Sequence, residues 1–389
     1  YVNDTLGHAA GDFVLIEVSR ILAELSEDED LAARVGGDEF VILLGPRKTI
    51  EQARTLAEKC LVEIRKDMEF EGRHCRVGAS FGIASAASDV VSNPTLLLAA
   101  DAALYLAKEQ GRNTVEVYSQ KMHTDVIEKR VLAAEIEEAI ADRAFEPYFQ
   151  PQFDAKTGAL AGMEALVRWN HPSRGILTPD VFLPVAYQLS VVDAIDRIVL
   201  AKGLQTVQDL NRAGHQVPKI SFNVVAKQLE DPEWRRLAKS IAIGSTVISF
   251  EVLESVLIEA QSSFFHFEID RLKEEGFQIE VDDFGSGHAS IIGLTQLDPC
   301  AMKIDQRLIF PLTEAKSARQ MVHAIIEIGK ALDIKVTAEG VESAEHAAIL
   351  AEMGCDTLQG YHFAKPLPAS ELQQFLDQRV SPQKSANAS

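Results

Sequence analysis

Several common sequence features are scarce in this chain of 389 residues. It has four cysteines, Cys60, Cys75, Cys300 and Cys355, and none of them forms a CxxC pair or a cluster with histidine. This pattern gives no support for a disulfide framework or a structural zinc site, and it is typical of proteins in a reducing compartment. We therefore expect a cytoplasmic location.

The chain also lacks a long apolar segment. No run approaches the ~20 residues that a helix needs to cross a bilayer, and no secretory signal peptide opens the sequence. We therefore expect no membrane contact from this segment. The first residues, YVNDTLGH, are already typical of a domain interior, so we expect a longer protein with an upstream sensor domain, whether or not the whole protein is attached to a membrane.

Positive charge is scarce as well. The chain has 38 Lys and Arg against 58 Asp and Glu, which gives a net charge of −20. This balance argues against affinity for a nucleic-acid polymer or an acidic membrane surface. A small phosphorylated substrate stays compatible with it, because bound cations and a few local bases can reverse the potential at one site.

At this length the chain can form two domains, and residues 1–118 alternate helical and strand patterns. The segment LAARVGGDEFVILLG predicts two strands joined by a tight turn at Gly36 and Gly37. A later helix is predicted to begin at Asn93 and to end before Gly111. We expect a compact α/β domain here.

A polar helical stretch without glycine or proline follows this domain. We place a helical linker at 119–131, a second domain at 132–378 and a disordered tail at 379–389. The second domain contains eight short apolar segments with helical patterns between them, which is the number of strands in a (β/α)8 barrel. These segments lie at 147–153, 160–169, 219–225, 247–254, 278–284, 301–305, 334–341 and 357–363.

Nearly every one of these predicted strands carries polar residues within an apolar run. Reacting residues lie at the carboxyl ends of the strands in such barrels, and side chains alternate along a strand with a period of two. An unpaired carboxylate in a barrel interior is strongly unfavourable, so polar residues on successive strands indicate a common partner. The polar residues include Glu164, Asn223, Glu251, Asp282, Asp283, Lys303, Glu339 and Gln359.

Among them, Glu164, Asn223, Glu251, Asp282 and Asp283 together form an all-oxygen set of ligands. Mg²⁺ and Mn²⁺ prefer oxygen, whereas zinc favours histidine and cysteine. Two adjacent aspartates suit a pair of ions with one carboxylate bridging both. Two ions about 3.5–4 Å apart can activate a water and hold the oxygens of a phosphodiester during in-line attack. The sequence therefore predicts a two-metal phosphodiesterase site.

Two basic residues fit the same reaction. Lys303 can orient or deprotonate the attacking water if neighbouring cations lower its pKa. Arg168 can hold a phosphate through its guanidinium group. For each of these two residues taken alone, the simpler alternative to a role in the reaction is an ordinary ion pair with an acidic side chain.

The second domain resembles the EAL family of cyclic-di-GMP phosphodiesterases. EALVRW matches its signature, and FNVV, FEVLES, DDFGSG, MKID, AEGVE and QGYHFAKPLP match its later motifs in order. The resemblance implies a barrel related to the TIM fold, two Mg²⁺ or Mn²⁺ ions, and hydrolysis of cyclic-di-GMP to linear pGpG in bacterial second-messenger signalling. It implies metal ligands at Glu164, Asn223, Glu251, Asp282, Asp283 and Glu339; catalytic roles for Glu164, Glu339 and Lys303; a loop anchor at Glu254; and substrate contacts at Gln150, Arg168, Asp305 and Gln359.

The first domain resembles the GGDEF family of diguanylate cyclases, which has a nucleotidyl-cyclase-like α/β fold. NDTLGHAAGD, RVGGDEFVIL and DAALYLAKEQGRN match in order. The resemblance implies a Mg²⁺–GTP site with Asn3 and Asp12 at guanine, Asp38 and Glu39 at the metal and catalytic site, and Lys108 and Arg112 at the phosphates. Gly36 and Gly37 belong to the same nucleotide site.

The resemblance also implies that the first strand of the GGDEF domain, with a metal-binding aspartate, precedes residue 1. In the inhibitory site of this family an arginine stands three residues before the position of Asp30, and here Glu27 takes that place. We therefore expect no product inhibition through that site.

Three functions stay open. The leading hypothesis is a cyclic-di-GMP phosphodiesterase whose GGDEF domain is a GTP-responsive regulator. The second is a receptor that binds cyclic-di-GMP without cleaving it; members of that kind usually lack some metal ligands, and this sequence lacks none that we identify. The third is a bifunctional enzyme with net cyclase output, since the GGDEF motif is intact. The resemblance also implies a homodimer.

Overall fold

The structure, a computed structural model, describes residues 6–86, 93–109, 111–256, 263–287 and 291–386. The chain divides into two compact units, Tyr1–Leu132 and Ala133–Ser389, and each is described by itself. Among the described residues, no helix is both long and apolar enough to cross a membrane.

The first unit combines helices with three two-stranded sheets, as the α/β pattern predicts. Its elements are α2 (His8–Leu25), β1 (Leu31–Gly36), β2 (Glu39–Leu43), α3 (Ile50–Ile64), β3 (Met68–Phe70), β4 (Arg73–Cys75), β5 (Phe81–Ile83), α4 (Asn93–Glu109), β6 (Val115–Val117) and the beginning of α5 (Gln120–Ala141).

The predicted tight turn joins β1 and β2. These strands are antiparallel, and Gly36 pairs with Glu39, so the chain reverses at Gly37 and Asp38. Gly37 has a φ of 52°, a conformation that favours glycine. The turn therefore needs the second glycine of the motif for its backbone geometry.

Helices of the first unit pack through small and apolar side chains. Leu22 of α2 packs with Cys60 and Ile64 of α3 in one buried cluster. On β5, a Cβ atom at Gly82 would lie 2.1 Å from the carbonyl oxygen of Ala100 in α4. Helix α4, which connects β5 to its parallel partner β6 in sequence, can therefore lie against β5 only because residue 82 has no side chain.

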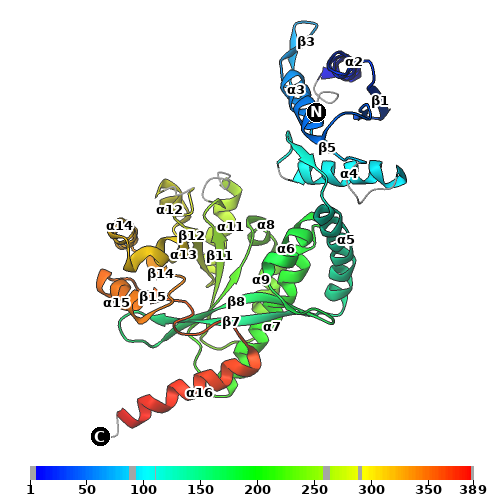
Figure 1. Cartoon of the computed structure of the whole chain (residues 1–389). Helices are drawn as coiled ribbons and strands as arrows, with labels where there is room; N and C mark the ends of the chain where they lie inside the picture. Colours follow the sequence, from blue (N-terminus) through cyan, green and yellow to red (C-terminus); the bar gives the residue numbers. More distant parts are fainter. Residues whose placement is uncertain (1–5, 87–92, 110, 257–262, 288–290, 387–389) are drawn as a thin grey trace. The chain divides into compact units, whose positions relative to one another are not determined.

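The second unit is built around a closed barrel of eight strands with helices outside it (Figure 1). The barrel strands are β7 (Phe145–Asp154), β8 (Leu160–His171), β10 (Lys219–Asn223), β11 (Val247–Leu253), β12 (Gln278–Phe284), β13 (Ala301–Ile304), β14 (Lys335–Ala338) and β15 (Thr357–Leu358). The short strands β9 (Gly175–Leu177) and β16 (Leu367–Pro368) pair with β8 and β7. The barrel closes because β15 pairs with β7.

The predicted number of barrel strands is confirmed, but the barrel departs from a regular (β/α)8 pattern at its first strand. β7 runs antiparallel to both of its neighbours, β8 and β15. Only residues 155–159 connect β7 to β8. A parallel pair needs a crossover of a dozen or more residues, so this short connection imposes a hairpin.

The second unit also contains the end of α5, and its remaining helices lie outside the barrel. They are α6 (Pro179–Gln188), α7 (Val192–Arg212), α8 (Ala226–Leu229), α9 (Pro232–Lys239), α11 (Ser263–Glu274), α12 (Ile291–Leu297), α13 (Gln306–Ile309), η1 (Phe310–Thr313), α14 (Lys316–Ala331), α15 (Ala344–Met353) and α16 (Ala369–Ala386). Helix α16 continues into the segment 379–389, for which a disordered tail is predicted. Adding residues to the end of a helix that has already formed costs little free energy. This accounts for a helix that runs to Ala386 where the sequence predicts disorder.

Candidate functional site

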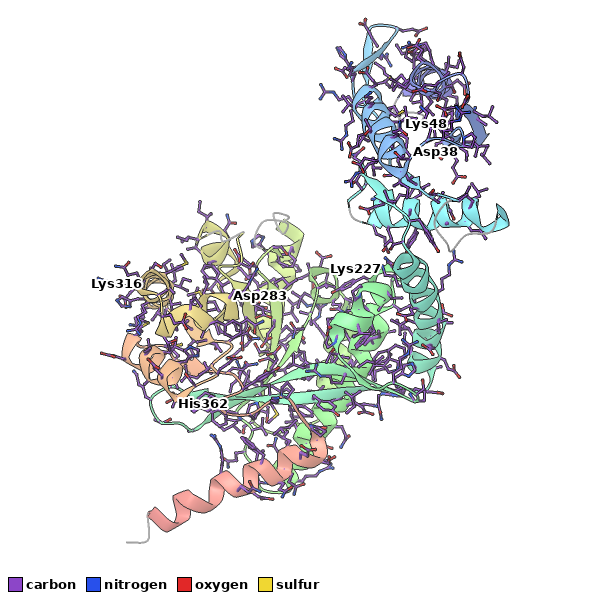
Figure 2. The ribbon with its side chains drawn as sticks, viewed as in Figure 1. Asp38, Lys48, Lys227, Asp283, Lys316 and His362 are labelled. Carbon is purple, nitrogen blue, oxygen red and sulfur yellow. The ribbon has the colours of Figure 1, made fainter. Side chains whose placement is uncertain are left out.

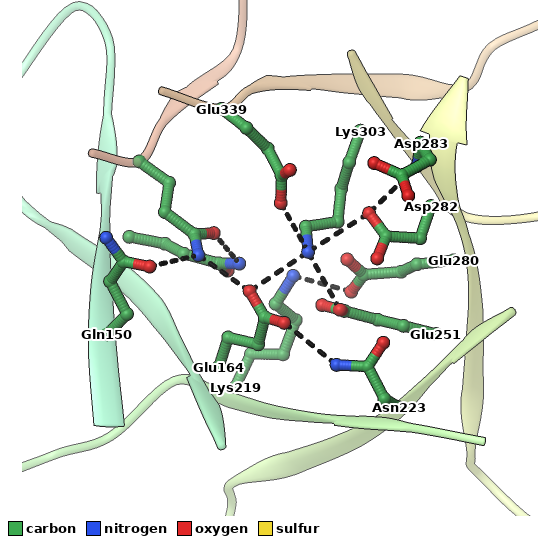
Figure 3. A network of polar contacts seen from close by, with 12 residues as sticks. Gln150, Glu164, Lys219, Asn223, Glu251, Glu280, Asp282, Asp283, Lys303 and Glu339 are labelled. Carbon is green, nitrogen blue, oxygen red and sulfur yellow. Dashed lines mark hydrogen bonds and ion pairs between the residues drawn. The ribbon is translucent and has the colours of Figure 1, made fainter. Parts of the chain in front are cut away.

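The carboxylates predicted to bind metals meet at one end of the barrel. Glu164 lies on β8, Glu251 on β11 and Asp282 on β12, and Glu339 follows β14 directly. Parallel strands place their carboxyl ends on the same side of a barrel, and alternate residues of each strand face inward. Figure 3 shows these side chains converging on Lys303 of β13.

Lys303 is the centre of this carboxylate cluster. Its side chain is completely buried. The Nζ atom lies 3.0 Å from Glu164 Oε2, 2.8 Å from Glu251 Oε2, 3.3 Å from Asp282 Oδ1 and 2.6 Å from Glu339 Oε1. One ammonium group thus forms ion pairs with four carboxylates from four different parts of the chain.

The charges in the cluster act on Lys303 and Glu164 in opposite directions. Burial alone would lower the pKa of Lys303, but the charges of the surrounding carboxylates raise it well above its ordinary value. Burial alone would raise the pKa of Glu164, but the charge of Lys303 and hydrogen bonds from Gln359, Lys303 and Asn223 lower it to about 2. The contacts among the described residues therefore favour the charged forms of both side chains, the ammonium group of Lys303 and the carboxylate of Glu164.

The positive charge of Lys303 does not fully balance the negative charge of the other carboxylates in the cluster. Burial, followed by repulsion from neighbouring carboxylates, raises the pKa of Glu251, Asp282 and Asp283. The same causes raise the pKa of Glu339 to about 8, although Lys303 opposes them. One lysine is too little positive charge for this site, and divalent cations would supply the remainder.

The oxygen atoms fit two metal ions. Glu164, Glu251 and Asp282 offer carboxylate oxygens within 4.8 Å of one another, and so do Asp282, Asp283 and Glu339. Asp282 belongs to both groups, as a bridging carboxylate would. The donors are all carboxylate oxygens, which suits Mg²⁺ or Mn²⁺. Asn223, the remaining predicted ligand, donates from Nδ2 to Glu164 Oε1 at 2.9 Å.

Amide side chains fix Glu164 from the other side. Gln359 Nε2 donates to Glu164 Oε2 at 2.6 Å and to Gln150 Oε1 at 3.1 Å. Gln152 Nε2 donates to Gln359 Oε1 at 2.7 Å. The structure therefore brings two residues predicted to contact substrate, Gln150 and Gln359, next to a predicted metal ligand. Sequence reasoning missed Gln152, although the period of two from Gln150 points to it.

Glu254 lies just beyond β11 and contacts the loop that follows β12. Its Oε2 atom accepts hydrogen bonds from Gly285 N, Ser286 N and Ser286 Oγ, each at 3.1 Å. These hydrogen bonds join the loop to the segment just beyond β11. They hold the backbone next to Asp283, which has a φ of 54° (Figure 2 labels Asp283). A non-glycine residue in this conformation is uncommon, and the neighbouring hydrogen bonds help to maintain it.

Asp305 and Arg168 are also predicted to contact substrate. Within the described residues, no hydrogen bond or ion pair joins either of them to the carboxylate cluster. Asp305 caps α13 by accepting from Arg307 N at 2.8 Å, and it also pairs with the Arg307 guanidinium. Arg168 donates to the carbonyl of Val167, and its guanidinium lies 5.8 Å from the centre of the Tyr148 ring. Arg168 and Tyr148 line a hollow of about 310 Å³.

The predicted nucleotide residues of the first unit are exposed. Gly36, Gly37, Asp38 and Glu39 lie at the β1–β2 turn, Asp12 lies on α2, Lys108 on α4, and Arg112 follows α4 (Figure 2 labels Asp38). Within the described part of the chain, no hydrogen bond or ion pair joins these side chains to one another. Asn3 lies outside the described residues.

Comparison with protein families identifies both units. The family model described as "EAL domain" matches residues 133–366, more than half of the chain, and the model described as "Diguanylate cyclase, GGDEF domain" matches residues 1–114. The chain belongs to the EAL domain family and carries a GGDEF domain ahead of the EAL domain.

Curated relatives share this tandem arrangement over most of the chain. The chain is 34% identical over 377 residues to the bifunctional diguanylate cyclase/cyclic di-GMP phosphodiesterase MucR of Pseudomonas aeruginosa, covering 95% of this chain and 54% of that protein. It is 31% identical over 379 residues to the cyclic di-GMP phosphodiesterase NbdA of the same organism, covering 96% and 48%. The chain therefore spans about half the length of the curated relatives it matches.

Solved structures match the EAL domain. A MucR phosphodiesterase in complex with c-di-GMP is similar at 29% identity with a TM-score of 0.57, covering 62% of this chain and 99% of that one. An EAL domain protein from Listeria monocytogenes is similar at 28% identity with a TM-score of 0.53, covering 62% and 96%.

We expect metal binding to compete with protons at this site. Since the pKa of Glu339 is raised to about 8, this carboxyl is largely protonated at about pH 6 and must ionise to bind a cation. The affinity for Mn²⁺ should therefore rise with pH, by up to about tenfold per pH unit below pH 8. Isothermal titration calorimetry in buffers of different ionisation enthalpy measures both the affinity and the protons released.

The matched control for this experiment is Glu339→Gln, which removes the titrating group. Its Mn²⁺ affinity should be weaker and should change less with pH over the same range. A wild-type affinity that stays constant between about pH 6 and pH 8 would contradict the assignment.

Proposed function

We propose that the EAL domain hydrolyses cyclic-di-GMP to linear pGpG with two bound Mg²⁺ or Mn²⁺ ions, as part of bacterial second-messenger signalling. The observation that carries this proposal is the pair of oxygen groups that share Asp282 around the buried Lys303. The activity named for MucR and NbdA, and the c-di-GMP bound by a similar solved structure, support this substrate.

Six residues would hold the ions: Glu164, Asn223, Glu251, Asp282, Asp283 and Glu339. When bound, the ions would lower the pKa of a water molecule and neutralise the charge on the phosphodiester oxygens. All six lie on or directly after barrel strands, so rigid elements hold the donors.

The remaining residues would orient the reactants. Lys303 is a donor with a raised pKa, so we assign it to orienting the attacking water rather than to removing its proton. Gln150 and Gln359 would align the substrate beside Glu164, and Glu254 would hold the loop after Asp283 near the ions. Arg168 would approach a phosphate from the hollow that it lines. Asp305 would contact the substrate from its position just before α13.

A receptor that binds cyclic-di-GMP without cleaving it is the alternative. Binding a phosphodiester does not require two complete groups of carboxylates, and the chain has both. The complete donor set therefore favours turnover over binding alone.

Purified protein with Mg²⁺ or Mn²⁺ should convert cyclic-di-GMP to pGpG. Glu164→Gln keeps the size of the side chain but removes a metal-binding charge, so kcat should fall by roughly a thousandfold. Glu352→Gln, which changes an exposed glutamate of α15, should leave kcat within about twofold of the wild type. Chromatography of the nucleotides measures the product.

Two results would overturn the phosphodiesterase proposal. Tight binding of cyclic-di-GMP by the wild type with no metal-dependent product would favour the receptor. Equal activity of Glu164→Gln and the wild type would contradict the placement of the reaction at this cluster.

For the GGDEF domain we propose binding of Mg²⁺–GTP and regulation of the EAL domain. The exposed turn at Gly37 and Asp38 supports a nucleotide site, and the cyclase activity named for MucR makes a second enzymatic activity the rival. The protein with GTP alone should form no cyclic-di-GMP, whereas GTP should change the rate of cyclic-di-GMP hydrolysis by severalfold.

The matched variant for this test is Asp38→Asn, which should lose the response to GTP but retain basal hydrolysis. Formation of cyclic-di-GMP or pGpG from GTP by the wild type would overturn the regulatory assignment in favour of a cyclase. Chromatography of the nucleotides separates the two outcomes.

We further propose that the protein acts in the cytoplasm as a homodimer. All four cysteines are free, and Cys60, Cys75 and Cys355 are buried, as suits a reducing compartment. The homodimer rests on the resemblance to the two families.

A further inference from the structure

A second buried layer of polar side chains lies below the carboxylate cluster. Ser221, Ser249 and Glu280 each precede a predicted metal ligand by two residues on the same strand, and all three are completely buried. The period of two places them inside the barrel, one step further from its carboxyl end. In barrels of this kind Val, Ile and Leu usually fill such a layer, so a glutamate here needs a partner.

The partner of Glu280 is Lys219. Lys219 Nζ donates to Glu280 Oε1 at 2.5 Å, and the Lys219 side chain is 16% exposed. Lys219 lies on β10 and Glu280 on β12, so the lysine reaches across β11 (Figure 3). Its aliphatic chain passes over Gly162 of β8, where a Cβ atom would lie 3.0 Å from Lys219 Cε. The absence of a side chain at residue 162 makes room for this ion pair.

The pair is close to the carboxylate cluster but separate from it. Glu280 pairs in register with Glu251 on the neighbouring strand and lies two residues before Asp282. Within the described part of the chain, Glu280 Oε2 and Glu251 Oε1 have no hydrogen-bond partner. Hydrogen bonds within the described residues therefore do not join Glu280 to Glu251, and Glu280 acts on the cluster through its charge.

The formal charges explain why a cation belongs here. The cluster holds five carboxylates, on Glu164, Glu251, Asp282, Asp283 and Glu339, around the single ammonium group of Lys303. When all five are ionised, as metal binding requires, four negative charges remain, and two divalent cations neutralise them. An unpaired Glu280 would add a fifth that two such ions could not balance.

We propose that Lys219 and Glu280 are positioning residues for the metal site, forming a counter-charge pair that fixes the charge of the barrel interior. This inference rests on the proposed two-metal function. Lys219 cancels the charge of Glu280, and the carboxylates above keep the net charge that two divalent ions match. Neither residue binds an ion or the substrate itself.

The two charges of the pair have opposite effects on a bound cation, and this permits a test with single variants. Glu280→Gln leaves an unpaired ammonium group below the site and should weaken Mn²⁺ binding by roughly tenfold. Lys219→Met leaves an unpaired carboxylate and should strengthen Mn²⁺ binding by roughly tenfold. The double variant contains a neutral pair and should bind Mn²⁺ within about twofold of the wild type.

The experiment is isothermal titration calorimetry of the full chain with Mn²⁺, without substrate. Lys335→Met is the matched control, because Lys335 also begins a barrel strand, β14, but has an exposed side chain. It should leave the affinity unchanged. Melting curves in EDTA establish that each variant is folded. If a single variant fails to fold, the double variant still tests the proposal, since a tenfold change in its affinity would contradict it.

The outcomes separate this inference from the function on which it rests. Opposite shifts in the single variants, with recovery in the double variant, support the counter-charge pair. Shifts of the same sign, or unchanged affinities in folded single variants, overturn it in favour of a pair that only stabilises the fold. A wild type that binds no Mn²⁺ would contradict the two-metal function itself.

Discussion

The second unit depends on the contact between one buried ammonium group and the carboxylates around it. Lys303 is completely buried and lies within 3.3 Å of oxygens from four acidic side chains. Each of these charges would cost several kcal/mol if it were buried alone. The barrel therefore tolerates its acidic interior only if the strands bring the acids to a shared cation. The surplus negative charge that remains is what makes the site suitable for metal ions.

The antiparallel first strand has a consequence for this site. Because β7 lies between β8 and β15, Gln150 and Gln152 of β7 can contact Gln359, which directly follows β15. Gln359 in turn donates to Glu164 on β8. The closure of the barrel and the orientation of a predicted metal ligand therefore depend on the same three strands. A change in the pairing of β7 would displace both.

Much of the site could be predicted because it follows from local patterns. A period of two on short apolar strands is enough to turn Glu164, Glu251 and Asp282 inward, and barrel geometry then brings them together. The direction of β7 could not be predicted from its own residues, because strand direction depends on the connection and on pairing. The contacts of Lys219 with Glu280 and of Gln152 with Gln359 could not be predicted for a similar reason: the two residues of each pair lie distant in sequence, and only the closed barrel places them in contact. The resemblance predicts a substrate contact at Asp305, and it gives no indication of the second role that the structure shows, the cap of the short helix α13.

The central claim is that two cations share Asp282 between two groups of carboxylates. Anomalous X-ray diffraction from crystals grown with Mn²⁺ tests it most directly, because it locates the ions without reference to activity. The account predicts two anomalous peaks, one among Glu164, Glu251 and Asp282 and the other among Asp282, Asp283 and Glu339, about 3.5–4 Å apart. A single peak, or no peak among these side chains at saturating Mn²⁺, would contradict it.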